Sequence, residues 1–183
     1  STNSYLKKLL SNSTPLLDGT VIMAERQFAG RGQSDNIWES EFGKNLTFSL
    51  GAELGAATGN LNQAYSLAAG ASAQADIAID KNAAITINAG IIELIGKKIN
   101  NNVKNRSIAL IPLLVGVKYY FTPVVYGSAQ LGTTVFTNSG GGSRFTYVPG
   151  LGFKLDKNID LLVKYTGLSD AGGIFGARVA YVF

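Results

Sequence analysis

The chain has 183 residues, of which 46% are hydrophobic and only 15% are charged, and its formal net charge at pH 7 is +4. Soluble domains average about 25% charged residues, so this chain is unusually poor in charge. It contains no Cys and no His, which excludes disulfides, thiolate or imidazole metal sites, and Ser-His or Cys-His catalysis.

The first 44 residues read as mixed helix and strand. Ser1-Thr2-Asn3 stand before an apolar spacing over residues 5–10, which predicts a short capped amphipathic helix that ends by Pro15. Residues 20–25 predict a buried strand, and residues 29–36 predict a mobile Gly-rich loop ahead of Trp38. No export signal is visible at the start of the chain as given, and one could have been removed.

From Asn45 onward the sequence alternates between apolar and small or polar residues. Leu46, Phe48 and Leu50, for example, alternate with Thr47 and Ser49. This period of two is typical of strands whose two faces meet different surroundings. It recurs in about eight segments, the smallest number that bacterial outer-membrane barrels use. The segments are 46–55, 65–79, 85–91, 111–121, 125–135, 145–155, 159–166 and 175–183.

The links between these segments alternate in length. Three are tight turns of turn-forming residues, at 80–82, 122–123 and 156–158. Four are longer, at 57–63, 96–107, 138–143 and 167–172. Short turns at one end and loops at the other predict an all-β, up-and-down antiparallel barrel. We therefore expect two domains, a fragment at 1–44 and a barrel at 45–183.

Periodicity alone allows two kinds of barrel, because a soluble lipocalin-like carrier alternates as well, with its apolar face inside. Three features favour the membrane kind. The polar face is mostly Gly, Ser, Thr and Ala, aromatic residues gather near segment ends, and the chain stops on an aromatic residue. The aromatic residues are Tyr119, Tyr120, Phe121, Phe145, Tyr147, Tyr181 and Phe183. No apolar run reaches the roughly 18 residues of a transmembrane helix.

If the apolar face meets lipid, seven charged residues point into the lumen. Because eight strands leave just enough room for side chains, we expect these charges to pair into a plug, with a gated narrow pore as the alternative. They are Glu53, Asp76, Lys118, Lys154, Asp160, Lys164 and Arg178. Nothing puts a substrate between Glu53 and Asp76, so no acid/base pair is expected.

Basic residues elsewhere carry less information. They form no helical stripe, which argues against nucleic-acid binding. Residues 97–106 hold four of them and could meet anionic lipopolysaccharide, although an ordinary solvated loop is the simpler interpretation.

Residues 51–183 resemble the small porin-like β-barrel proteins of the bacterial outer membrane. The resemblance lies in residues 116–123, residues 126–132 and the closing Val179-Ala180-Tyr181-Val182-Phe183. It implies an outer-membrane location, lipid around the barrel and recognition of Phe183 by the barrel-assembly machinery. The ligand, the pore activity and the oligomeric state are left open.

Residues 1–50 resemble the start of the catalytic domain of biotin–protein ligases, which act on acetyl-CoA carboxylase. The motifs are Ser1-Thr2-Asn3, Glu25-Arg26-Gln27, Ala29-Gly30-Arg31-Gly32, Trp38 and Gly43 to Leu50. The resemblance implies a cytoplasmic enzyme that uses biotin and ATP. It implies that biotin and its adenylate are held by Ser1, Thr2, Asn3, Gln27, Gly30, Arg31, Gly32 and Trp38.

This second resemblance stops before the family's Lys-Trp-Pro-Asn-Asp segment, whose Lys neutralises the reacting carboxylate and phosphate. Without that Lys the adenylation step loses a main source of charge stabilisation. We therefore expect the fragment to be inactive, the chain to have no catalytic residues of its own and no cofactor or metal, and the junction near Asn45 to join unlike pieces.

Overall fold

The computed structural model describes residues 8, 11, 27–31, 37–40, 46–100, 103–137 and 142–183, with backbone only for 27–31, 37–40, 99–100 and 103–104. The chain divides into two compact units, Ser1–Asn45 and Leu46–Phe183, and each is described by itself. None of the helices within the described residues is both long and apolar enough to cross a membrane.

The first unit contains one described pair of strands. β1 (Gln27–Arg31) pairs antiparallel with β2 (Ile37–Ser40). The prediction of a mobile loop from residue 29 is therefore wrong for residues 29–31, because their backbone belongs to this ladder. Lys8 and Ser11 are helical, and the rest of the predicted helix and the predicted strand at 20–25 lie outside the described residues.

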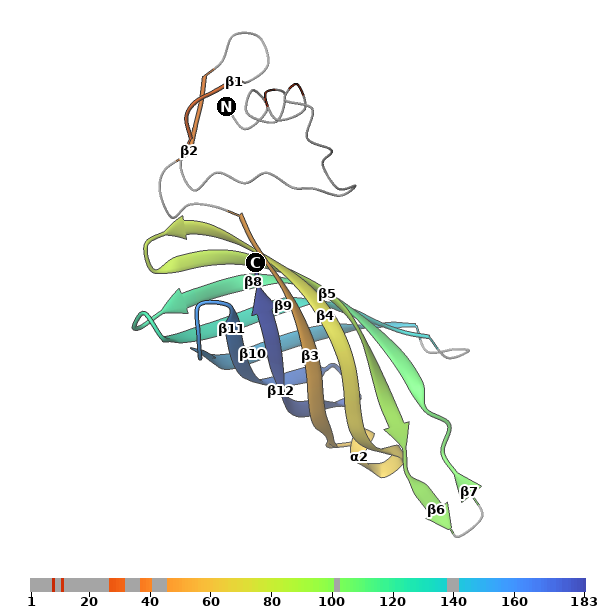
Figure 1. Cartoon of the computed structure of the whole chain (residues 1–183). Coiled ribbons are helices and arrows are strands. Elements are labelled where there is room, and N and C mark those ends of the chain that lie inside the picture. The colour runs from red at the N-terminus through yellow and green to blue at the C-terminus, as the bar shows by residue number, and fades with distance from the viewer. Residues whose placement is uncertain are drawn as a thin grey trace. The chain divides into compact units, whose positions relative to one another are not determined.

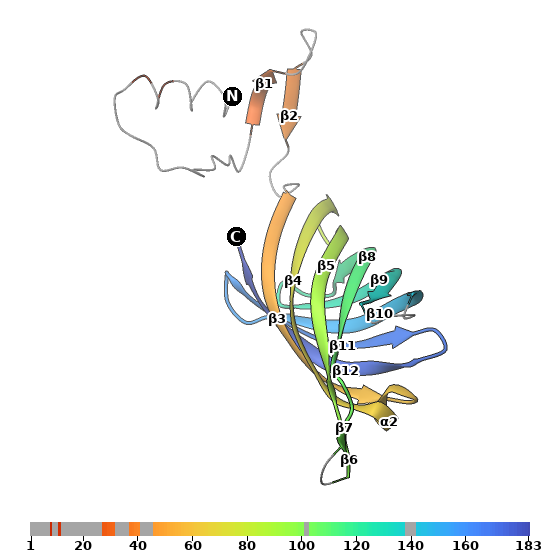
Figure 2. The ribbon, with the colours of Figure 1, turned by 90° about the vertical axis from the view of Figure 1, so that its right-hand side faces the viewer.

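The second unit is a closed eight-stranded barrel (Figures 1 and 2). Every strand pairs antiparallel with its neighbours, and β12 pairs with β3 to close the cylinder. This confirms the predicted up-and-down topology. The barrel strands are β3 (Leu46–Thr58), β4 (Tyr65–Asp80), β5 (Ala83–Gly96), β8 (Ile108–Tyr120), β9 (Val125–Phe136), β10 (Ser143–Lys154), β11 (Ile159–Leu168) and β12 (Gly172–Val182).

The two ends of the barrel differ in their connections. Tight turns join β4 to β5, β8 to β9 and β10 to β11, and we call this the turn end. The opposite loop end carries the short helix α2 (Leu61–Ala64) and a two-stranded ribbon of β6 (Lys98–Asn100) and β7 (Val103–Lys104). Figure 1 shows this ribbon continuing β5 and β8 past the barrel.

One predicted loop is much shorter than expected. β11 and β12 stay paired as far as Leu168 and Gly172, so their link is only residues 169–171. Asp170 and Gly172 have positive φ, at 59° and 101°. These left-handed conformations let the chain reverse in so few residues.

The predicted orientation of the faces is confirmed. Leu67 and Val115 are each 55% exposed on the outside, whereas Gln74 is 3% exposed and lies inside. The apolar residues of the outer face include Leu50, Leu54, Leu67, Ile87, Ile91, Leu113, Val115, Val117, Leu131, Leu151, Phe175 and Val179. Of the seven aromatic residues predicted near segment ends, Tyr120 is half-buried and the other six are exposed. The Tyr120 ring is tilted against that of the fully buried Tyr126, with 5.4 Å between the ring centres.

Candidate functional site

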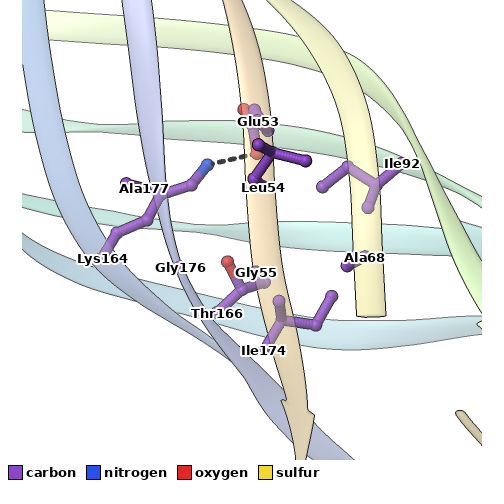
Figure 3. Close-up of a pocket in the computed structure, with 10 residues that line it drawn as sticks. All are labelled: Glu53, Leu54, Gly55, Ala68, Ile92, Lys164, Thr166, Ile174, Gly176 and Ala177. Carbon is purple, nitrogen blue, oxygen red and sulfur yellow. Dashed lines mark ion pairs between the residues drawn. The ribbon is translucent and has the colours of Figure 1, made fainter. Parts of the chain in front are cut away.

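The polar lumen holds the strongest concentration of ionisable groups that the structure describes. Near its middle, the Lys164 Nζ atom on β11 lies 2.8 Å from a carboxylate oxygen of Glu53 on β3 (Figure 3). Both side chains are more than nine-tenths buried. The second Glu53 oxygen accepts a hydrogen bond of 2.6 Å from the hydroxyl of Ser72 on β4. The carboxylate is therefore saturated by partners from two neighbouring strands.

Arg178 extends this network toward the turn end. Only 2% of it is exposed, and it donates to the hydroxyls of Ser72 at 2.8 Å and Ser49 at 3.1 Å. Although the register sets Arg178 opposite Glu53, the two form no ion pair within 4.0 Å, because Ser72 bridges them. The guanidinium lies close against Gly51, where an added Cβ would be 2.6 Å from its Nε atom.

A second cluster surrounds Asp76 on β4. Its carboxylate pairs with the Lys118 ammonium at 2.7 Å and accepts a hydrogen bond of 2.8 Å from the Gln74 amide. The Gln74 carbonyl in turn accepts from Gln130 at 3.1 Å and from Asn88 at 3.3 Å. These bonds join β4, β5, β8 and β9 through the interior.

Of the other two predicted lumen charges, one is buried and one is not. Asp160 accepts a hydrogen bond of 2.6 Å from the Tyr126 hydroxyl and is buried. Lys154, by contrast, is exposed, although the register sets it opposite Asp160 on the inward face, so it lies at the mouth of the lumen. It is the last residue of β10, and its ammonium lies 4.3 Å from the ring centre of Tyr120 at the turn end.

The lumen near the loop end is apolar, which the sequence interpretation did not foresee. Inward residues of β3, β4, β5, β8, β11 and β12 form one buried cluster, and Leu61 of α2 belongs to it. Partly buried rings of Tyr65 and Phe136 pack against the cluster. Its buried members are Ala57, Leu61, Ala68, Ile92, Leu94, Leu110, Leu168 and Ile174.

A small cavity lies where the polar and apolar halves meet (Figure 3). It is lined on one side by Glu53 and Lys164, and on the other by Ala68, Ile92 and Ile174. Its volume of about 10 Å³ is enough for roughly one water molecule. Side chains fill the lumen around it, as expected for a barrel of eight strands.

The residues expected to hold biotin are only partly described. Gln27, Gly30 and Arg31 lie on β1 and Trp38 lies on β2, where the register sets Gly30 opposite Trp38. The strand pair thus brings the Gly-Arg segment and the Trp together in the backbone. Ser1, Thr2, Asn3 and Gly32 lie outside the described residues.

Comparison with protein families adds one finding. The model of the biotin/lipoate A/B protein ligase family matches residues 1–104, which is more than half of the chain. By this match the chain belongs to the biotin/lipoate A/B protein ligase family. The matched range continues past Asn45 through β3, β4 and β5, so more than half of it, residues 46–104, falls in the barrel unit.

Solved structures match the barrel instead. Ail, an outer membrane protein of Yersinia pestis whose structure was determined in a phospholipid bilayer nanodisc, matches with a TM-score of 0.54 at 14% identity. That match covers 75% of this chain and 98% of Ail. A de novo designed transmembrane β-barrel matches with a TM-score of 0.51 at 17% identity, over 75% of this chain and 95% of that one. At these identities the likeness shows the fold. No curated protein matches.

The carboxylates inside the barrel of this chain are already engaged, which limits the chemistry they can perform. Glu53 and Asp76 are each engaged by a Lys ammonium, so neither is a free carboxylate for proton transfer. Asp160 is occupied by a Tyr hydroxyl. The interior is therefore built to hold strands together.

Several residues of these networks were not singled out from the sequence. Ser49, Ser72, Gln74, Asn88 and Gln130 all line the lumen and bond to its charges or to one another. They share the inward parity of the charged residues. That parity is the signal by which the full polar set could have been found.

Proposed function

We propose that this chain is an outer-membrane β-barrel protein with a structural or interaction role and no chemistry of its own. The proposal rests on where the exposed charged side chains of the barrel lie. Within the eight barrel strands, the exposed charged side chains are Asp80 and Lys154, each the last residue of its strand, and Glu93, three residues before the end of β5. A surface in water would carry charges along its whole length, whereas one in lipid confines them to its edges.

The soluble carrier alternative fits this surface poorly. A lipocalin-like barrel needs an apolar interior for its ligand and a charged exterior. Here the outer face is apolar, and the middle and turn end of the interior are filled by ion pairs and amides.

A narrow pore is also a weaker candidate than a closed barrel. Water and ions would have to pass the apolar cluster at the loop end, where Leu94 and Leu110 are almost completely buried. Beyond it they would meet the Glu53–Lys164 pair. We expect no steady conductance in planar bilayers.

Further parts of the proposal concern orientation and assembly. We propose that the loop end faces outside the cell and that the barrel-assembly machinery recognises the C-terminal strand. In support, Phe183 is exposed and its backbone N–H bonds to the Phe48 carbonyl at 2.9 Å, at the seam where the barrel closes.

Membrane insertion is tested with the full chain. We expect it to sediment with the outer membrane, to need detergent for extraction, and to migrate faster on a gel before heating than after. A chain that is monomeric and freely soluble without detergent would refute the proposal.

The family match supports one other candidate, a cytoplasmic biotin ligase that would need biotin and ATP. Its strength is the match over residues 1–104. Its weakness is that the residues after Leu50 form barrel strands and lack the Lys-bearing segment that adenylation requires. We therefore propose that this segment is inactive.

A further inference from the structure

The loop end carries most of the net charge of the barrel unit. Residues 46–183 contain eleven basic and seven acidic residues. Three of each lie in the lumen and cancel. Five basic residues lie at the loop end against two acidic ones, which leaves this end with three of the unit's four excess positive charges. The basic residues are Lys97, Lys98, Lys104, Arg106 and Arg144, and the acidic ones are Glu93 and Asp170.

Among the described side chains of the barrel, Lys97, Lys98, Arg106 and Arg144 have no carboxylate partner. The ion pairs there are Asp76–Lys118 and Glu53–Lys164, both in the lumen. Residues 99–104 and 138–141 contain no Asp or Glu, so those segments have no anion to supply. The described part of the barrel therefore does not neutralise Lys97, Lys98, Arg106 and Arg144.

Four of the five cations sit together in what we call the basic hairpin, residues 97–106, which includes β6 and β7. The register sets Lys98 opposite Lys104, and like charges in opposite positions of a ladder repel. Lys98 and Arg106 are exposed. The Lys97 ammonium bonds to the backbone carbonyl and side-chain oxygen of Asn62, at 2.5 and 2.6 Å, which anchors the hairpin base to the loop that contains α2.

The position of these cations favours a membrane surface over a soluble polymer. Ile95 is the last outward apolar residue of β5, and Lys98 follows it by three positions. At the rise of a strand this separation is about 10 Å. The sequence between β6 and β7, and the links at 59–64, 137–142 and 169–171, contain no Lys or Arg. Lys98 thus lies two residues after the end of β5 and Arg106 two residues before the start of β8, close to the apolar face of the barrel, where headgroups would be.

We propose that the basic hairpin binds the phosphate groups of lipid headgroups in the leaflet at the loop end. The inference rests on the proposed function, because it requires the barrel to lie in a membrane. Lys and Arg form charge-assisted hydrogen bonds with phosphate oxygens. A basic side chain near an anionic membrane surface strengthens binding by about fivefold.

The test uses the full chain in phosphatidylcholine micelles, titrated with lipid A and followed by native mass spectrometry. The variant Lys98→Gln with Arg106→Gln removes two exposed cations, and we expect lipid A to bind about 20- to 30-fold more weakly. The matched control, Lys81→Gln with Lys157→Gln, removes two exposed cations from the turn end. We expect the control to bind within twofold of the wild type, and inorganic phosphate at the same concentration not to compete.

Several outcomes would overturn the inference. One is equal weakening in variant and control, and another is no weakening in either. A third is tighter binding of a soluble sulfated polysaccharide than of lipid A, which would indicate a polymer ligand. If the double variant fails to show heat-modifiable migration, the single Lys98→Gln variant is used, with a fivefold loss expected. A chain that does not enter bilayers refutes the proposed function, whereas one that enters and binds lipid A equally in all variants refutes only this inference.

Discussion

Replacing Glu53 by Gln tests whether the lumen charges stabilise the barrel. The substitution keeps the size of the side chain but leaves the Lys164 ammonium buried without its anion, 2.8 Å from a neutral amide oxygen or nitrogen. Arg178 is linked to the Glu53 carboxylate by the Ser72 hydroxyl, so it loses this nearby negative charge as well. Two buried cations would then lack a counter-charge.

The magnitude follows from the burial of the pair. Removing one partner of a buried ion pair costs about 3–5 kcal/mol, because the remaining charge is uncompensated, whereas removing both partners is often nearly neutral. We expect Glu53→Gln to lower the free energy of unfolding by about 3 kcal/mol or more. Adding Lys164→Met should recover most of that loss. Comparing the stability change of the double variant with the sum of the changes in the two single variants measures the coupling energy.

The assay is denaturant unfolding of the full chain in vesicles, followed by circular dichroism and gel migration, under conditions where unfolding and refolding curves coincide. Glu93→Gln is the matched control, since it is the same change at an exposed position, and it should shift stability by under about 0.5 kcal/mol. A loss in Glu53→Gln no larger than that of the control would refute the reasoning. So would a double variant that is less stable than Glu53→Gln alone.

Three further predictions concern the outer face, the apolar cluster and the ligase-like segment. Val115→Arg puts a cation on the outer face near the middle of β8 and should cost about 2–4 kcal/mol of folding in vesicles, with Val115→Leu as a nearly neutral control; an unaffected folding yield would contradict a lipid-facing surface. Leu110→Ala, at a side chain 1% exposed, should lower the free energy of unfolding by about 2–5 kcal/mol, and a change below about 0.5 kcal/mol would show that the cluster is not tightly packed. Biotin-dependent ATP–pyrophosphate exchange by the full chain should not exceed background, and measurable exchange would restore the ligase candidate.

The fold was largely predictable, because alternation and turn composition act locally. The period of two predicts that Leu50, Leu54 and Val115 lie on the outer face, and tight turns such as Asp156-Lys157-Asn158 predict the turn end. Strand lengths were less predictable. Residues 167–172 read as a loop because they include Gly and Asp, yet pairing with β12 extends β11 to Leu168.

The interior was predictable in kind but not in its pairing. Parity indicates that Glu53, Lys164 and Arg178 share the lumen, but it cannot say that Lys164 takes the carboxylate while Arg178 bonds to serines. That choice depends on the stagger between strands. The apolar cluster could not be predicted either. Leu94 and Leu110 point inward, but they are apolar like the residues of the outer face, so the alternation does not distinguish them.

The division of the lumen into two halves bears on how the barrel is stabilised. Lipid gives the outer face no preference between one apolar neighbour and another, so the interior must specify which strands pair. At the turn end this is done by directional bonds across the lumen, such as Lys118 to Asp76 and Tyr126 to Asp160. At the loop end it is done by packing, with Leu61 of α2 closing the cluster. Because the polar bonds depend on exact stagger and the apolar contacts tolerate adjustment, substitutions in the polar half should be the more damaging to a unique register.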